Sequence, residues 1–293
     1  MTAIDGPDFI CIGMPKAGTG WLYDQLRFHP GFWLSPVKEF GYLSRENPQL
    51  RSAQKLHSLS RADPERFRTK STRNRQKWDD RDFAFLDDAV ALAGQERDIT
   101  RYAALFRHKG ALKSGDITPG YALMGADVVA EIAEKLPHVK VIFLVRDPIA
   151  RLWSHINHYH NDDEFDAALL EDPAAFSDFL DDHPRIWDLS KPTQIVARWK
   201  KTAPSLAFRH YFFDDLVEHP KRTRFKILRF LGADPTVPSA ELSNDSNRKN
   251  GNAKLVMTDP IKSVLRDRLA DEIRACASKL GGSARKWPAR YGL

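Results

Sequence analysis

The sequence is poor in the features that mark secreted, membrane-spanning and disulfide-rich proteins. It contains two cysteines, Cys11 and Cys276, a number that excludes a disulfide framework and predicts two buried thiols. No run of about 18 apolar residues occurs, which argues against a membrane-spanning helix. No apolar segment follows a basic start, so a secretion signal is not visible. We therefore expect a cytoplasmic protein, for which peripheral contact with a membrane stays open.

Signatures of nucleic-acid recognition and of metal binding are also missing, although the chain is basic. The formal net charge is +6, which suits a protein that handles anions. No zinc-finger, helix-turn-helix or base-stacking pattern accompanies this charge, so we expect neither a nucleic-acid partner nor a bound metal. The length is compatible with a single domain, residues 1–293, that carries a basic insertion at about residues 45–110.

The most informative segment is residues 7–26, where an apolar stretch leads through a glycine-containing loop into a helix. Residues 9–12 predict a short buried strand, and residues 21–26 carry apolar side chains at helical spacing. Between them, Gly18 permits a tight turn and Lys16 lies at the tip of the loop. The first N–H groups of a helix are unpaired and carry the positive end of its dipole. We therefore expect a phosphate or sulfate site here.

This loop differs from the common loop that binds nucleoside triphosphates. That loop reads G-x-x-x-x-G-K-[ST] and places its lysine directly after the last glycine, whereas Lys16 precedes Gly18 by two positions. No serine or threonine follows the lysine as a dedicated magnesium ligand. The pattern favours an anion bound without metal. Taken alone, the segment is also compatible with an ordinary strand-to-helix turn that carries a solvated lysine.

A second strand-to-helix transition lies within residues 139–160. Asp147 is expected to cap the helix, with a proline as its first residue. Arg146 ends the strand, and Arg151 and Ser154 lie three apart on one face of the helix. We expect these three donors to converge on a phosphate, which a guanidinium binds bidentately. The alternative is an arginine paired with its neighbour and a serine on the helix surface.

Together these segments resemble the sulfotransferases that use 3′-phosphoadenosine 5′-phosphosulfate (PAPS) as sulfate donor. The two motifs that carry the resemblance are PKAGTGW at residues 15–21 and RDPIARLWS at residues 146–154. Three weaker similarities, to the glycan-type branch of that family, are SPVKEF at residues 35–40, GDITPGY at residues 115–121 and the segment at residues 213–232. The resemblance covers most of the chain.

The resemblance implies a fold, a donor site and a catalytic pair. The fold would be α/β and P-loop-like, with a mostly parallel central sheet flanked by helices. The donor would be bound by Lys16, Ala17, Gly18, Thr19, Gly20, Trp21, Arg146, Ser154, Arg248, Lys249 and Gly251. Lys16 would stabilise the leaving phosphate, and Glu39 would be the general base.

The sequence departs from the family pattern at three places. Gly20 stands where serine or threonine is common, and residues 116–117 replace a Glu-Lys pair. Residues 247–254 match the basic, glycine-containing loop over the nucleotide only loosely. The identity of the base therefore stays open, and the alternatives to Glu39 are Asp116 and the histidines His29, His108, His155 and His158.

The resemblance favours transfer to a hydroxyl group of a carbohydrate, a glycolipid or a lipid headgroup. The alternatives are a nucleotide kinase and a non-catalytic sensor of nucleotides or anions. Oligomeric state and acceptor identity are not encoded in any motif. Two charged stretches outside the motifs, the basic residues 51–82 and the acidic residues 161–182, are either solvated surface or contacts for a substrate.

Further elements are expected from periodicity alone. Helices are predicted near residues 126–136, 193–201, 221–231 and 259–279, and a strand at residues 207–213.

Overall fold

The computed structural model describes residues 5–69, 77–238 and 254–293, and its centre is a parallel sheet. The strands are β1 (Phe9–Cys11), β2 (Gly115–Ile117), β3 (Lys140–Val145) and β4 (Ala207–Phe212). They lie in the order β2-β1-β3-β4. The α/β fold class predicted from the sequence is confirmed.

The strand sequences explain why this sheet lies in the core. β1 reads FIC and is fully buried, and β3 reads KVIFLV with every residue after its lysine buried. Continuous apolar runs of this kind are typical of parallel strands covered on both faces. Because all strands run the same way, their carboxyl ends meet at one edge. The chain moves from β1 to β2 on one side and then to β3 on the other, so the switch point where such sheets bind ligands lies beyond β1.

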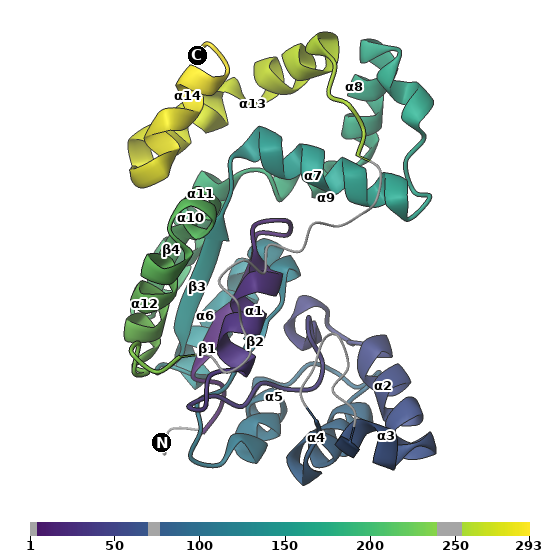
Figure 1. The fold of residues 1–293 in the computed structure, drawn as a ribbon, viewed down its shortest axis with the longest axis vertical. Coiled ribbons are helices and arrows are strands. Elements are labelled where there is room, and N and C mark those ends of the chain that lie inside the picture. Colours follow the sequence, from purple (N-terminus) through teal and green to yellow (C-terminus); the bar gives the residue numbers. More distant parts are fainter. Residues whose placement is uncertain (1–4, 70–76, 239–253) are drawn as a thin grey trace.

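Helices cover this sheet where periodicity predicts them. The four predicted segments correspond to α6 (Ala126–Lys135), α10 (Pro192–Thr202), α12 (Pro220–Leu231) and α13 (Asp259–Lys279). Helices α1 (Thr19–Arg27) and α7 (Pro148–Asn161) follow β1 and β3. Figure 1 shows α7 and α13 at the end of the molecule toward which β3 and β4 run. The two motif-bearing helices thus begin at the same edge of the sheet.

The predicted basic insertion is largely helical. Its elements are α2 (Arg51–Ala62), α3 (Pro64–Thr69), α4 (Asp80–Ala91), α5 (Ile99–Ala104) and η2 (Leu105–Lys109), and η1 (Tyr42–Ser44) directly precedes it. Figure 1 shows α2, α3 and α4 grouped beside the sheet. Some of its charge is neutralised internally, since Arg61 of α2 and Asp87 of α4 form an ion pair. Within the predicted basic stretch of residues 51–82, the lysine and arginine side chains of residues 51–69 are all exposed.

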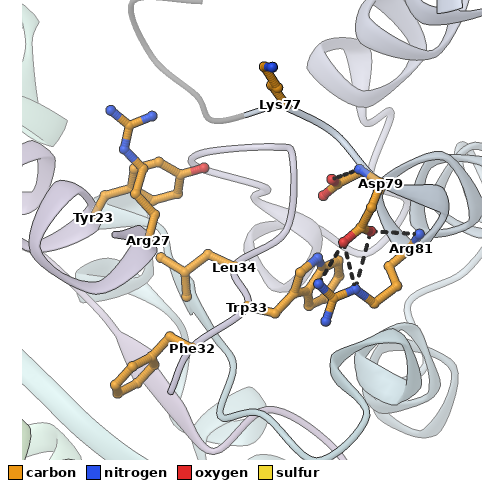
Figure 2. A pocket seen from close by; sticks show the side chains of 9 residues that line it. Tyr23, Arg27, Phe32, Trp33, Leu34, Lys77, Asp79 and Arg81 are labelled. Atoms are coloured by element: carbon orange, nitrogen blue, oxygen red, sulfur yellow. Dashed lines mark hydrogen bonds and ion pairs between the residues drawn. The ribbon is translucent and has the colours of Figure 1, made fainter. Parts of the chain in front are cut away.

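A small hollow marks where the insertion meets α1 (Figure 2). It has a volume of about 80 Å³ and lies among Tyr23 and Arg27 of α1, residues 32–34 and the start of α4. There Asp79 and Asp82 form a capping box. Ligand pockets usually hold about 300–1,000 Å³. This hollow is therefore too small for a nucleotide.

The acidic stretch packs against the carboxyl-terminal part of the chain. It contains η4 (Ala167–Leu170) and α8 (Pro173–Asp182), and α9 (Pro184–Asp188) follows. The Arg268 guanidinium on α13 donates to Asp181 at 2.8 Å and to Ser177 at 2.7 Å. Part of the acidic surface thus has an internal partner.

Three short elements complete the described chain, namely α11 (Phe213–Glu218), η5 (Gly282–Lys286) and α14 (Trp287–Arg290). Cys11 and Cys276 are both buried and unpaired with each other, as predicted. Burial raises the pKa of the Cys11 thiol to about 12. Among the helices of residues 5–69, 77–238 and 254–293, none combines the length and apolar character of a membrane crossing.

Candidate active site

The loop between β1 and α1 has the backbone of an anion site. Lys16 and Gly18 have φ values of 65° and 95°, so the loop turns through two left-handed residues. Within the described residues no side chain caps α1, and its first N–H groups are left to a ligand. Arg146 Nη1 donates to the Lys16 carbonyl at 2.7 Å, which ties the loop to the end of β3. Burial, with a smaller contribution from Arg146, lowers the pKa of the Lys16 amine.

The two glycines of this loop have different roles, which predicts opposite effects of alanine. A Cβ on Gly18 would lie 2.7 Å from Leu216 Cδ2 and would keep an unfavourable φ, so Gly18→Ala should destabilise the protein by about 1–3 kcal/mol. A Cβ on Gly20, which lies in α1, would meet none of the described atoms within 4 Å. Gly20→Ala should therefore add about 0.5–1 kcal/mol of stability. In urea unfolding, the midpoint should fall for Gly18→Ala and rise for Gly20→Ala. Midpoints that shift in the same direction in both variants would contradict this assignment.

A large cavity opens directly above the loop, at the carboxyl edge of the sheet. Its volume is about 860 Å³, within the usual range for small-molecule sites. The predicted site residues that line it are Lys16, Gly18, Thr19, Gly20, Trp21, Glu39 and Ser154. The histidines His155 and His158 also line it. The structure thus brings Lys16 and Glu39, 23 positions apart in the sequence, to one cavity.

Other predicted donor residues lie elsewhere. Ala17 is a buried residue of the loop itself and does not line the cavity. Arg146 lines a neighbouring hollow of about 220 Å³, where its guanidinium lies 4.5 Å from the centre of the Phe213 ring. Phe213 lines both hollows. Arg248, Lys249 and Gly251 lie outside the described residues.

Glu39 lies at the cavity wall and is paired with its neighbour. Its Oε1 accepts from Lys38 Nζ at 2.8 Å, and both side chains are partly exposed. Glu39 has a φ of 59°, so it is one of four non-glycine residues with a left-handed backbone in the described chain, and Lys16 is another. Such costly conformations concentrate at functional sites. Both residues that the motifs point to as the catalytic pair are thus among these four.

Comparison with known proteins identifies the family of the chain. A family model described as the sulfotransferase family matches residues 7–236. The chain belongs to this family. Among solved structures, the sulfotransferase of Alicyclobacillus acidocaldarius is similar at 18% identity and a TM-score of 0.66, over 96% of this chain and 98% of the other. The sulfotransferase domain of the Synechococcus PCC 7002 olefin synthase is similar at 18% identity and a TM-score of 0.52, over 90% and 95%.

A third similar structure is the sulfotransferase domain from the curacin biosynthetic pathway, at 13% identity and a TM-score of 0.51 over 92% of this chain and 99% of the other. At these low identities, the similarity to the three structures shows a shared fold. A comparison with curated proteins finds no significant match.

Asp116, an alternative base, accepts hydrogen bonds from three hydroxyl groups in this sulfotransferase. Its carboxylate accepts from Tyr121 at 2.6 Å, Thr118 at 2.7 Å and Tyr102 at 3.1 Å. Burial raises the pKa of Asp116, and these hydroxyls oppose that shift. In turn the Gly41 N–H donates to Thr118 Oγ1 at 3.2 Å. This arrangement supports a positioning role for Asp116, since it anchors the loop that carries Glu39.

The predicted convergence of three donors is wrong for Arg151. Its side chain is fully buried and donates to Ser190 Oγ at 3.0 Å and to the Ile186 carbonyl at 2.7 Å. Burial lowers its pKa to about 9. Helical spacing places Arg151 near Ser154, but the partners offered by α9 and the residues after it direct the guanidinium inward. Asp147, in contrast, caps α7 as predicted, accepting from the Ile149 N–H at 3.0 Å.

His155 is unsuited to be the base. Its Nδ1 lies 3.0 Å from Arg151 Nη1, and because a guanidinium only donates, Nδ1 is the acceptor. The ring proton therefore resides on Nε2. Burial, reinforced by the Arg151 charge, lowers the pKa of His155 to about 3, so the ring is neutral near pH 7 and offers a donor to the cavity.

The other three histidines differ in their access to the cavity. His29 is buried and accepts from the Gly31 N–H at 3.0 Å, and His108 contacts Asp88 in the insertion. Neither lines the cavity. His158 does line it, and its Nδ1 lies 3.3 Å from Asp162. Glu39 and His158 are thus the predicted bases with access to the cavity.

Proposed function

We propose that this sulfotransferase moves the sulfuryl group of PAPS to a hydroxyl group of a carbohydrate, a glycolipid or a lipid headgroup. The observation that carries the proposal is the common cavity of Lys16, the uncapped start of α1 and Glu39. An open helix start beside a lysine suits a phosphosulfate. PAPS would supply a sulfuryl group already activated for transfer.

Each residue then has a defined task. Backbone N–H groups of Gly18, Thr19 and Gly20 hold the oxygens of the phosphosulfate, and Lys16 stabilises the charge that develops on the leaving phosphate. Glu39 takes the proton of the acceptor hydroxyl as the new S–O bond forms and the old one breaks. General-base help of this kind typically contributes about 10²–10⁴ in rate.

Ser154 and Arg146 are proposed to bind the 3′-phosphate, which predicts nucleotide-selective losses. Ser154→Ala and Arg146→Gln should weaken 3′-phosphoadenosine 5′-phosphate (PAP) about 10–100-fold, because a charge-assisted contact is worth about 1.5–3 kcal/mol. ADP, which lacks the 3′-phosphate, should bind each variant and the wild type alike. Ser154→Ala is the cleaner variant, since Arg146 also holds the Lys16 carbonyl. Equal losses for PAP and ADP in titration calorimetry would refute the assignment.

Turnover separates the proposal from its alternatives. The protein, PAPS and a panel of hydroxyl acceptors are incubated with EDTA, and PAP and sulfated product are quantified. A sulfotransferase that needs no metal should form both in equal amounts. A nucleotide kinase would need magnesium and ATP, and a sensor would bind PAP without forming product. The two buried thiols suit a reducing compartment, so we also propose a cytoplasmic location for the protein. We further propose that residues 1–293 form one catalytic domain.

A further inference from the structure

We infer that the acceptor carries an anionic group, a carboxylate, sulfate ester or phosphate ester, and that Arg45 and Arg185 bind it. This acceptor class rests on the proposed sulfuryl transfer and narrows it. Arg45 follows η1 and Arg185 lies on α9, and both line the cavity that holds Lys16 and Glu39.

Arg45 lies on the side of the cavity away from the proposed 3′-phosphate residues, whereas Arg185 belongs to α9, which packs against α7, and its side chain reaches over Gly120 on the β2 side. The loop of Lys16 follows β1, in the middle of the sheet. Arg146 and Ser154 follow β3 on one side of it, whereas residues 118–120 follow β2 on the other. The segment that carries Glu39 is bonded to this β2 side through Gly41 and Thr118. An acceptor placed against Glu39 therefore lies on the β2 side.

Arg185 and the η1 segment meet over Gly120 on that side. A Cβ built on Gly120 would lie 3.3 Å from Arg185 Nη2 and 4.0 Å from Ser44 Oγ. The guanidinium and the hydroxyl thus lie close together above a floor that has no side chain. Arg45 is the next residue after Ser44. The recess over Gly120 thus has one guanidinium beside it, and Arg45 lines the same cavity.

The charges of Arg45 and Arg185 are unmatched. Both residues are exposed, and within residues 5–69, 77–238 and 254–293 neither side chain has an ion pair or hydrogen bond. The acidic side chains of the cavity have other partners, because Glu39 pairs with Lys38 at 2.8 Å and Asp24 with Arg27 at 2.9 Å.

Lys16 is assigned to the donor and Lys38 pairs with Glu39, so the charges of Arg45 and Arg185 remain for the acceptor. A planar guanidinium binds a carboxylate, sulfate or phosphate through two parallel hydrogen bonds. An anionic acceptor would supply the ionic partner that the described residues do not give these two groups.

The test is titration calorimetry on the protein saturated with PAP. The probes are glucuronate, glucose 6-sulfate and glucose 6-phosphate, with glucose as the neutral reference. The wild type should bind the anionic sugars at least about tenfold more tightly than glucose, and Arg45→Gln with Arg185→Gln should remove that preference. Arg274→Gln, on the exposed side of α13, is the matched control and should change nothing.

Each outcome decides the inference. The inference is overturned if the wild type shows no preference for the anionic sugars, or if the double variant keeps that preference. If PAP still binds in the same experiment, the proposed transfer reaction is unaffected. Failure to bind PAP at all would instead contradict the proposed function. Vesicles of phosphatidylglycerol and phosphatidylcholine distinguish the source of the anion. Arginine-dependent binding to the former would assign it to a lipid headgroup, and arginine-dependent binding to the free sugars alone would assign it to a soluble acceptor.

Discussion

Replacing Lys16 by alanine is expected to lower kcat by about 10²–10³ while the protein stays folded. The reason is that its charge acts where negative charge develops as the donor bond breaks, and one such group typically contributes that much. The side chain is only partly buried at a loop tip, so its loss leaves no cavity in the core. The backbone strain is unchanged, since alanine and lysine both have a Cβ at this left-handed position.

Lys16→Met is the companion variant, because it keeps the length of the stem and removes the charge. Both variants should retain the wild-type melting temperature to within a few degrees, and Lys55→Ala on the exposed surface of α2 serves as control. A folded Lys16→Ala protein with near-wild-type turnover would remove this residue from the mechanism.

Glu39→Gln is expected to lose about 10²–10⁴ in kcat while it binds PAP as the wild type does. The amide keeps the size and hydrogen-bonding reach of the carboxylate but lacks the basicity to accept the proton. Because Glu39 is partly exposed and pairs with Lys38, the substitution should cost little stability. Turnover and PAP affinity are measured on the same preparation with an acceptor that the panel has identified.

Two outcomes would redirect the assignment of the base. If Glu39→Gln stays active, its contact with Lys38 is only a surface ion pair, and His158→Gln becomes the next variant. Asp116→Asn distinguishes positioning from base chemistry, because an amide cannot replace a carboxylate that accepts three hydroxyl groups. We expect this variant to lose about 1–3 kcal/mol of stability, visible as a lower melting temperature with or without acceptor.

The parts of the site that follow from local sequence were predictable. Apolar runs of β1 and β3, the Asp147 cap and the turn at Gly18 each depend on a few consecutive residues. The strand order was not predicted, and the pairing of Lys16 with Glu39 in one site required the family resemblance, because both features join segments that are distant in the sequence.

Features that depend on packing could not be predicted. Arg151 has the right spacing for a phosphate ligand, yet the carbonyl of Ile186 and the hydroxyl of Ser190 direct its side chain into the core. Arg185 belongs to no motif, and only the placement of α9 above Gly120 brings it to the cavity. The hydrogen bonds from three hydroxyl groups to Asp116 could not be predicted either, although GDITPGY contains two of the three donors.

The measurement that tests the central claim most directly is the melting temperature with saturating PAP compared with ADP, each with and without magnesium. A ligand at about 100 times its Kd adds about 2.7 kcal/mol of stability, which corresponds to several degrees for a chain of this length. A PAPS-dependent sulfotransferase should show that shift with PAP, with no need for magnesium, and a much smaller one with ADP. A larger shift with ADP and magnesium, or none with PAP, would contradict the claim.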